Sequence, residues 1–172
     1  MNERGSIGAT VTIVIVIILG VGALCLYPLM NTAKQADNIS EVSLQSALTN
    51  FANEECNKGD VYEEDFYKLI EEITGANTYN VELEIHVKGD SEGKKKTQAV
   101  SDKTGENGET IYFMSQIQEK WKSNQGKFGL EEDFQIYVRA ENTNTTMGTE
   151  LISPTSSDIS NIKAEATATC IK

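Results

Sequence analysis

Three cysteines and one histidine are the first residues of this 172-residue chain to consider for chemistry. Cys25 lies inside a long apolar run, where cysteine usually serves as a small apolar residue. Cys56 and Cys170 lie outside that run. They could form one disulfide that ties the C-terminus to the first soluble helix, or remain two separate thiols, because two cysteines have no diagnostic spacing. The sequence has no Cys-x-x-Cys pair and no His/Cys cluster, so we expect no metal site.

The histidine and the carboxylates do not form a recognisable catalytic set. His86 stands between Glu84 and Lys88 in an alternating stretch, on its polar side, where a lone histidine is usually a surface residue. The acidic run 63–65 predicts a solvated helix face, since acid–base chemistry needs a cleft and raised pKa values. Dinucleotide, phosphate-loop, zinc-protease and nucleophile-elbow motifs are absent from the sequence. We therefore expect no enzyme, no catalytic residue and no cofactor.

The element that must position the rest of the chain is the uncharged run from Gly5 to Ala33. Its apolar centre, residues 9–30, would form a helix of roughly 30–35 Å, which is enough to cross a bilayer. A cleaved signal peptide has a shorter apolar region followed by small residues, whereas this run ends in bulky residues 27–30. A buried core helix is the weakest alternative, because the run is apolar all round. We expect a signal anchor that stays in the membrane.

The distribution of charge predicts an exported domain. Arg4 and the amino terminus precede the apolar run and Lys34 follows it, so we expect a cytoplasmic N-terminus and an extracytoplasmic C-terminal domain. The chain has 15 basic and 26 acidic residues, a net charge of −11. Nucleic acid is therefore not an expected partner, since its phosphates need concentrated lysine and arginine. The acidity is typical of a solubilised domain.

Four segments follow from this pattern: a leader over residues 1–8, a transmembrane helix over 9–30, its amphipathic continuation over 31–57, and an exported domain over 58–172. In the continuation, one stripe recurs at three- and four-residue steps and predicts a helix packed on the domain. The stripe consists of Ala33, Ala36, Ile39 or Ser40, Ser43 or Leu44, Ala47, Leu48, Phe51 and Ala52. We expect one long helix. Two helices with a hinge near Tyr27–Asn31 are the alternative, because Pro28 removes a backbone donor.

The exported domain has an α+β pattern. Alternation predicts strands over residues 80–88, 133–141 and 161–170. Residues 110–114 can form a further short strand, for which a helix is the alternative. Strands with one polar face predict a small antiparallel sheet covered on one side by helix. The last strand turns small residues inward, which predicts that the long helix lies against it. Residues 89–109 form a long polar connection, either a mobile loop or a recognition loop.

Two short helices are predicted in this domain. The first covers residues 63–73, with Asp60 and Glu63 at the spacing of a capping box, although Tyr62 or Asp65 could shift its start. The second runs from Ser115, which forms a capping box with Gln118, through residue 121.

A family resemblance is carried by residues 4–5 ahead of the apolar run, by residues 26–39, and by the later stretches 115–117 and 141–146. With its single anchor, a helix that continues out of the membrane and a small sheet packed on it, the chain resembles pilins and pseudopilins. More narrowly, it resembles TadE-like proteins of the tight-adherence (Flp-type) pilus system, and small pilus-like proteins of Gram-positive bacteria. The resemblance is strongest over the first 60 residues and is architectural more than motif-based.

The resemblance also implies how the N-terminus would be processed. In that family a prepilin peptidase cuts after a glycine, and a glutamate five residues later helps the subunits into register. Gly5 or Gly8 would be the cut site here, and Thr10 or Ile13 would stand where the glutamate belongs. This departure suits a minor pilin or assembly component better than the bulk filament subunit.

The resemblance further implies a structural protein in the cell membrane, or in a surface filament, that assembles through its N-terminal helix. Its partners would be the membrane and other pilin-like subunits, pilus assembly proteins or copies of itself. Small residues in the apolar run, Gly20, Gly22 and Ala23, would allow neighbouring helices to approach closely. The alternative function is a signal-anchored exported domain that recognises a partner through residues 89–109.

Overall fold

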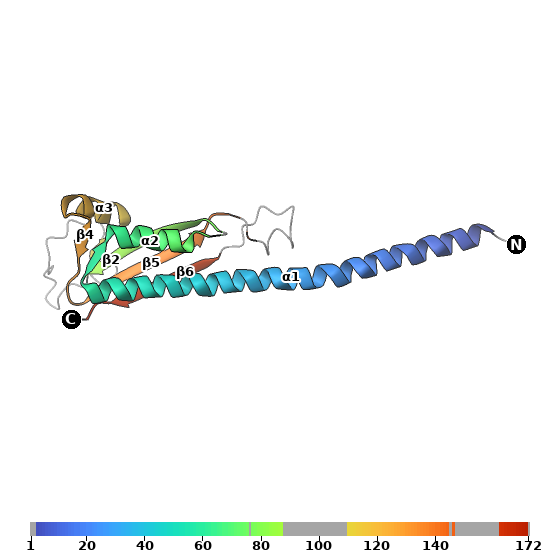
Figure 1. The fold of residues 1–172 in the computed structure, drawn as a ribbon, viewed down its shortest axis with the longest axis horizontal. Helices are drawn as coiled ribbons and strands as arrows, with labels where there is room; N and C mark the ends of the chain where they lie inside the picture. The colour runs from blue at the N-terminus through green and yellow to red at the C-terminus, as the bar shows by residue number, and fades with distance from the viewer. Residues whose placement is uncertain (1–2, 76, 88–109, 145, 147–161, 172) are drawn as a thin grey trace.

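One helix dominates the computed structural model, which describes residues 3–75, 77–87, 110–144, 146 and 162–171, with side chains from residue 11 onward. Helix α1 (Glu3–Lys58) projects far beyond a small α+β domain, as predicted (Figure 1). It runs through Pro28 without a break, so the prediction of a single helix is confirmed and the two-helix alternative is wrong. The helix ends at Gly59, whose φ of 78° favours glycine and whose N–H donates to the Glu55 carbonyl.

A four-stranded antiparallel sheet forms the floor of the domain, in the order β3–β2–β5–β6. The strands are β2 (Tyr79–Val87), β3 (Thr110–Tyr112), β5 (Phe134–Asn142) and β6 (Lys163–Thr169). The predicted alternation sets which face is buried: Leu83 lies opposite Val138, and Val138 lies opposite Ala166, all of them inward. The strand predictions are therefore confirmed, including the short strand at residue 110.

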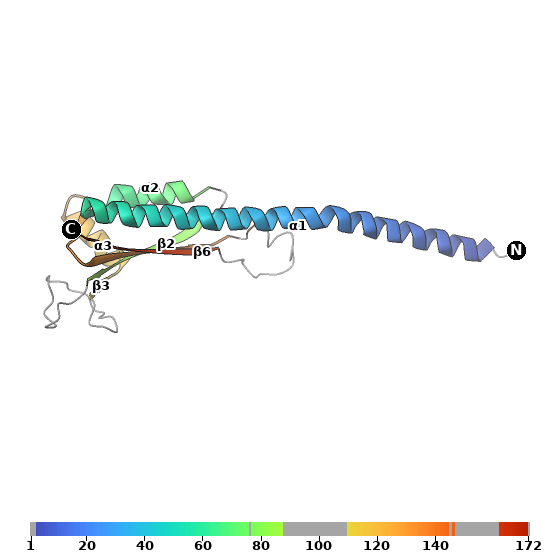
Figure 2. The same cartoon turned by 90° about the horizontal axis from the view of Figure 1, so that it is seen from below.

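The C-terminal half of α1 covers this sheet, with α2 (Glu63–Ile73) beside it (Figure 2). Leu44, Leu48 and Phe51 of the predicted stripe are buried in the core, which also contains Phe66 of α2 and Trp121 of α3 (Met114–Ser123). At the position left open in the stripe, Ser40 is half-buried whereas the Ile39 side chain is 69% exposed. Packing on the domain is therefore continuous only from about residue 40.

Small side chains let α1 lie close to the edge strand β6. Ala164, Ala166 and Ala168 are buried there, as predicted, and α1 packs directly against the strand. Cys56 of α1 and Cys170, the residue after β6, form a disulfide with their Cα atoms 4.7 Å apart, one of the two alternatives left open by the sequence. The Gln45 side chain also donates to the Glu165 backbone carbonyl at 2.8 Å.

The predicted helix over residues 63–73 is confirmed as α2, with Tyr62 as its N-cap, one of the alternatives left open, but the capping boxes predicted from Asp60 and Ser115 are wrong. Asp60 belongs to a short strand, β1 (Asp60–Tyr62), which pairs with β4 (Lys127–Gly129), and neither strand was predicted. At the start of α2, the Glu63 N–H donates to the Gly126 carbonyl instead of being served by a capping box. Helix α3 begins one residue before Ser115, because the Gln116 side chain accepts from the Phe113 N–H at 3.1 Å.

We predict that Cys170→Ser lowers the melting temperature of the detergent-solubilised chain by roughly 10 °C or more. The disulfide closes a loop between residues 114 positions apart, which in the chain-entropy model stabilises the fold by about 4–5 kcal/mol. Thermal unfolding followed by circular dichroism measures the change. Cys25→Ser is the matched control, since Cys25 is a free, exposed cysteine outside the domain. Equal melting temperatures for Cys170→Ser and the parent chain would contradict the prediction.

Candidate membrane-anchoring and assembly element

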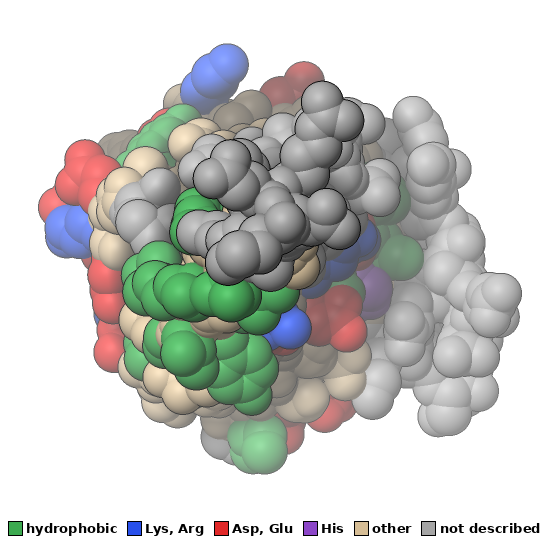
Figure 3. Space-filling model, turned by 90° about the vertical axis from the view of Figure 1, so that its right-hand side faces the viewer, with side chains coloured by type: hydrophobic (Ala, Val, Ile, Leu, Met, Phe, Trp, Pro, Cys, Tyr) green, Lys and Arg blue, Asp and Glu red, His purple; other side chains and the backbone are tan. Residues whose placement is uncertain are grey.

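The N-terminal half of α1 exposes its apolar side chains on all sides. From Val11 to Leu29 the large hydrophobic side chains are 49–77% exposed, and none of the most apolar window is buried against the domain. Figure 3, which looks along the molecule from its N-terminal side, shows hydrophobic side chains gathered together while acidic ones lie around the domain. By length and composition this helix can cross a membrane.

Such a surface is suited to burial in lipid or against a partner. Burying one large aliphatic side chain is worth about 1.5–3 kcal/mol, and this half of α1 leaves a continuous row of them uncovered. Soluble monomers rarely expose apolar patches of this extent. The projecting half of α1 is therefore the candidate functional site, and its chemistry is that of burial in lipid or against other helices.

The small residues of this half leave room for neighbouring helices. A Cβ atom added to Gly20 or Gly22 would meet nothing within 4 Å, and Ala23 is exposed. At about 100° of rotation per residue, Gly20 and Gly22 point to nearly opposite sides of the helix, and Ala23 lies about 60° from Gly20. The three residues do not make one face, but they would admit neighbours on more than one side. Packing through them stays a prediction.

The possible processing sites lie at the very start of the same helix. Gly5 and Gly8 both fall in the first turns of α1. Cleavage after either glycine stays a prediction. Ile13, one of the two positions where the family's glutamate would stand, is a 59% exposed apolar side chain.

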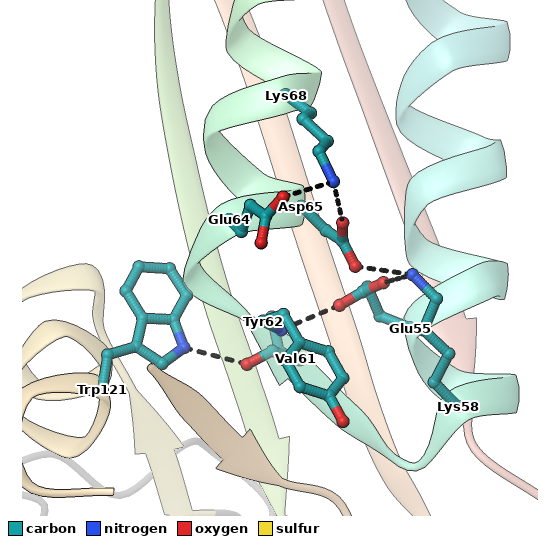
Figure 4. Close-up of polar contacts among 8 residues, drawn as sticks. All are labelled: Glu55, Lys58, Val61, Tyr62, Glu64, Asp65, Lys68 and Trp121. Atoms are coloured by element: carbon teal, nitrogen blue, oxygen red, sulfur yellow. Dashed lines mark hydrogen bonds and ion pairs between the residues drawn. The ribbon is translucent and has the colours of Figure 1, made fainter. Parts of the chain in front are cut away.

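At the other end of α1, the buried carboxylate of Glu55 joins the helix to the domain (Figure 4). The Glu55 side chain is only 1% exposed; one of its oxygens accepts from the Lys58 ammonium at 2.6 Å, and the other accepts from the Tyr62 N–H at 2.9 Å. Lys58 also donates to Asp65 of α2 at 2.7 Å. Because a buried charge is tolerated only when paired and hydrogen-bonded, these contacts hold α1, β1 and α2 in one arrangement.

The electrostatics of this network follow from burial and from the central lysine. Desolvation raises the pKa of Glu55, with the contacts to Lys58 and Tyr62 acting in the opposite direction. Hydrogen bonds to Asp65 and Glu55 raise the pKa of Lys58, which therefore stays protonated. The same hydrogen bond from Lys58 lowers the pKa of Asp65. The protonated Lys58 therefore links two carboxylates from different helices, Glu55 of α1 and Asp65 of α2.

Aromatic packing completes the attachment. The Trp121 indole N–H donates to the Val61 carbonyl at 2.9 Å, and its ring lies 5.7 Å from the Phe66 ring, centroid to centroid. Val61 is fully buried in the strand that links α1 to α2. The end of α1 is thus a rigid base for the projecting half.

His86, the one histidine considered for catalysis, lies in a described strand. His86 contacts the Glu84 carboxylate at 2.9 Å on the polar face of β2, with Tyr137 of β5 alongside. Among the described residues, no group of three or more histidine, cysteine, aspartate or glutamate side chains could hold a metal ion. Residues 89–109, considered for recognition, lie outside the described residues.

Sequence reasoning missed Glu55. The acidic run was expected to be solvated, which holds for Glu64, whose side chain is 80% exposed, but not for Asp65, which is 26% exposed and paired with Lys58. The available signal was spacing: Glu55 follows Phe51 by four residues and so continues the buried stripe. A carboxylate at a buried position needs a cation or a hydrogen-bond donor beside it, and Lys58 lies three residues further along the helix.

Comparison with known proteins adds no relative. The chain matches no protein-family model, no curated protein and no solved structure at a significant level. Its function must therefore be inferred from its own residues and fold.

We predict that Asp65→Asn lowers the free energy of unfolding at neutral pH by up to about 1 kcal/mol. Because the folded-state pKa of Asp65 is lowered, its contribution is fully present above the ordinary aspartate pKa of about 3.9 and is lost as the pH falls through the folded-state value. The difference from the parent chain should therefore vanish in acid.

Denaturant titration of the detergent-solubilised chain at neutral and acidic pH measures both effects. Glu64→Gln is the control, because that carboxylate contacts Lys68 on the surface and should change stability less. A stability difference for Asp65→Asn that persists unchanged in acid would contradict the assignment.

Proposed function

We propose that the chain is a membrane-anchored, pilin-like structural protein, a minor pilin or a pilus assembly component that assembles through α1. The observation that carries the proposal is the exposed apolar half of α1, continuous with a half that is built into the domain. This combination of anchor, helix and small antiparallel sheet is the architecture that the pilin resemblance implies. The proposal assigns no catalytic role.

The proposed orientation puts the N-terminus in the cytoplasm and the domain outside it. Arg4 precedes the apolar run, and positive charge is retained on the cytoplasmic side. The Cys56–Cys170 disulfide supports the same orientation, because disulfides persist in oxidising compartments and are rare in the cytosol.

The continuity of α1 supports a structural role. No loop separates the apolar half from the half packed on β6, so the domain and the apolar half are joined by an unbroken helix. Displacement or packing of the apolar half is therefore transmitted to the domain. A tethered binding domain would not need this stiffness, and its proposed recognition segment, residues 89–109, is outside the described residues.

We predict that deletion of residues 5–30 abolishes membrane retention but leaves the domain folded once its disulfide has been formed by oxidation, because none of the core side chains lies in that range. Alkaline carbonate extraction of cell membranes reads out retention, and circular dichroism reads out folding. The full-length Ile17→Lys, Ile18→Lys double variant should also lose retention, since charges at a helix centre cost about 2.5–3.5 kcal/mol each.

Tyr67→Lys, at a 47% exposed site on α2, is the matched control and should stay in the membrane fraction. Release of the parent chain by carbonate would contradict the proposed anchoring.

The N-terminal mass of protein recovered from its native membrane tests the pilin-like part of the proposal. We expect a mature chain that starts at Ser6 or Ala9, as prepilin processing after Gly5 or Gly8 would produce. A chain that starts at Met1 or Asn2 would instead mean a plain signal anchor and would count against pilin-like processing.

A further inference from the structure

The membrane-distal half of α1, residues 31–58, is charged only on the side that faces its own domain or flanks it. Its charged residues are Lys34, Asp37, Glu41, Glu54, Glu55 and Lys58. From residue 44 onward, the buried residues of this half, Leu44, Leu48, Phe51, Ala52 and Glu55, point toward the domain. At about 100° of rotation per residue, all the charged residues lie within about 105° of the mean direction of these buried residues. The opposite side carries no charge from residue 31 to residue 57, although the chain is 24% charged overall.

This opposite side has the spacing of a helix–helix seam. The uncharged residues alternate in steps of four and three, the a/d pattern of a coiled coil, and all are exposed. We call this set the outward face: Gln35, Ile39, Val42, Ser46, Thr49 and Asn53. The positions that flank such a seam are also uncharged here, among them Asn38, Ser43, Asn50 and Asn57.

The outward face is unusual for a solvated helix surface. Ile39 is 69% and Val42 is 70% exposed, one turn apart. A helix face that remains in water normally carries charged side chains, and depletion of charge is the feature that marks the centre of protein interfaces.

Its polar residues can also be buried at low cost. The Thr49 hydroxyl donates to the Gln45 carbonyl at 2.7 Å, and on the same side of the helix the Thr32 hydroxyl donates to the Pro28 carbonyl at 2.9 Å. These two hydroxyls are satisfied within α1, so contact with another helix leaves neither of them unpaired. The asparagine and glutamine side chains can exchange hydrogen bonds with a neighbouring helix.

The outward face continues into the apolar half. The same steps of four and three lead back from Gln35 through Thr32, Pro28, Cys25, Val21 and Ile18 without meeting a charge. Ile18 and Val21 are more than half exposed. One uninterrupted uncharged seam therefore runs from the proposed membrane segment to the far end of the domain.

We propose that the outward face binds the outward face of a second copy of this chain, with the two α1 helices parallel and side by side. The inference rests on the proposed membrane anchoring, because anchors in one membrane make neighbouring copies parallel. Each copy carries a net charge of −11, so two copies repel one another wherever carboxylates meet. The outward face is the side of α1 on which two copies can meet without that repulsion. A partner that recognises charged side chains would have no charge to bind on this face.

Site-directed crosslinking in the membrane tests this arrangement. Val42→Cys and Ser46→Cys place a thiol on the outward face, and Lys34→Cys and Glu41→Cys place one at exposed sites on the other side of the helix. All four are made in full-length Cys25→Ser chains that keep the Cys56–Cys170 disulfide. Membranes are treated with a short bismaleimide, and carbonate extraction is run on the same samples.

We expect the two outward-face variants to give a product of twice the chain mass, in several-fold higher yield than the two control variants. A third variant, Val42→Glu combined with Ser46→Cys, should lower that yield several-fold, because it places like charges in the seam. Equal yields at face and control sites, a product that contains only another protein, or no product from retained protein would each overturn the inference while leaving anchoring intact. Release of the parent chain by carbonate would overturn both the anchoring and the parallel pairing.

Discussion

The close packing of α1 on the edge strand β6 is the contact on which the rest of the structure depends. Alanines on the inward side of β6 allow the helix backbone to approach, and a larger side chain there would push it away. The disulfide and the Glu55 network then fix the end of the helix to the strand and to α2. These contacts fix the direction in which the apolar half of α1 projects from the domain.

The sequence of α1 is divided into three kinds of surface. One end is apolar all round, which suits lipid. The other end has a domain-facing side of leucine and phenylalanine and an opposite side without charge. A helix that only had to support its own domain would be free to carry lysine and glutamate on its outer side, as α2 does with Glu64 and Lys68.

Periodicity predicted the parts of this fold that depend on repeated burial. Strands β2, β5 and β6 alternate over seven to nine residues and α1 repeats its stripe over several turns, so the pattern is strong in each. Strands β1 and β4 have three residues each, as β3 does, but they include Asp60 and Gly129, residue types that are depleted in strands, and their pairing depends on contacts between distant segments. The capping box predicted for α2 was wrong for the same reason, although the helix begins at Glu63 as predicted: the carboxylate that accepts from the N-cap N–H comes from Glu55 in α1, and Asp60 lies in a strand.

In the candidate site too, the sequence predicted the features that depend on consecutive residues and left open those that depend on contacts between elements. Composition alone predicted the apolar run, because a membrane segment is a property of consecutive residues. The pairing of Cys56 with Cys170 depends on which elements meet, and a single sequence leaves it open. The spacing from Phe51 could have indicated that Glu55 is buried, but not that its second partner is the Tyr62 N–H. The charge-free outer side of α1 could be read from the sequence only after the structure had shown which side the domain occupies.

The two ends of the chain lie at opposite ends of the molecule (Figure 1). The disulfide holds Cys170 beside the last turns of α1, about 40 Å along the helix from residue 30 at 1.5 Å per residue. If the apolar half is embedded in a bilayer, the carboxyl terminus is displayed at the tip furthest from the lipid. A peptide or reporter fused there would be held away from the membrane by the continuous helix α1. Reduction of the Cys56–Cys170 disulfide would loosen its attachment to that helix.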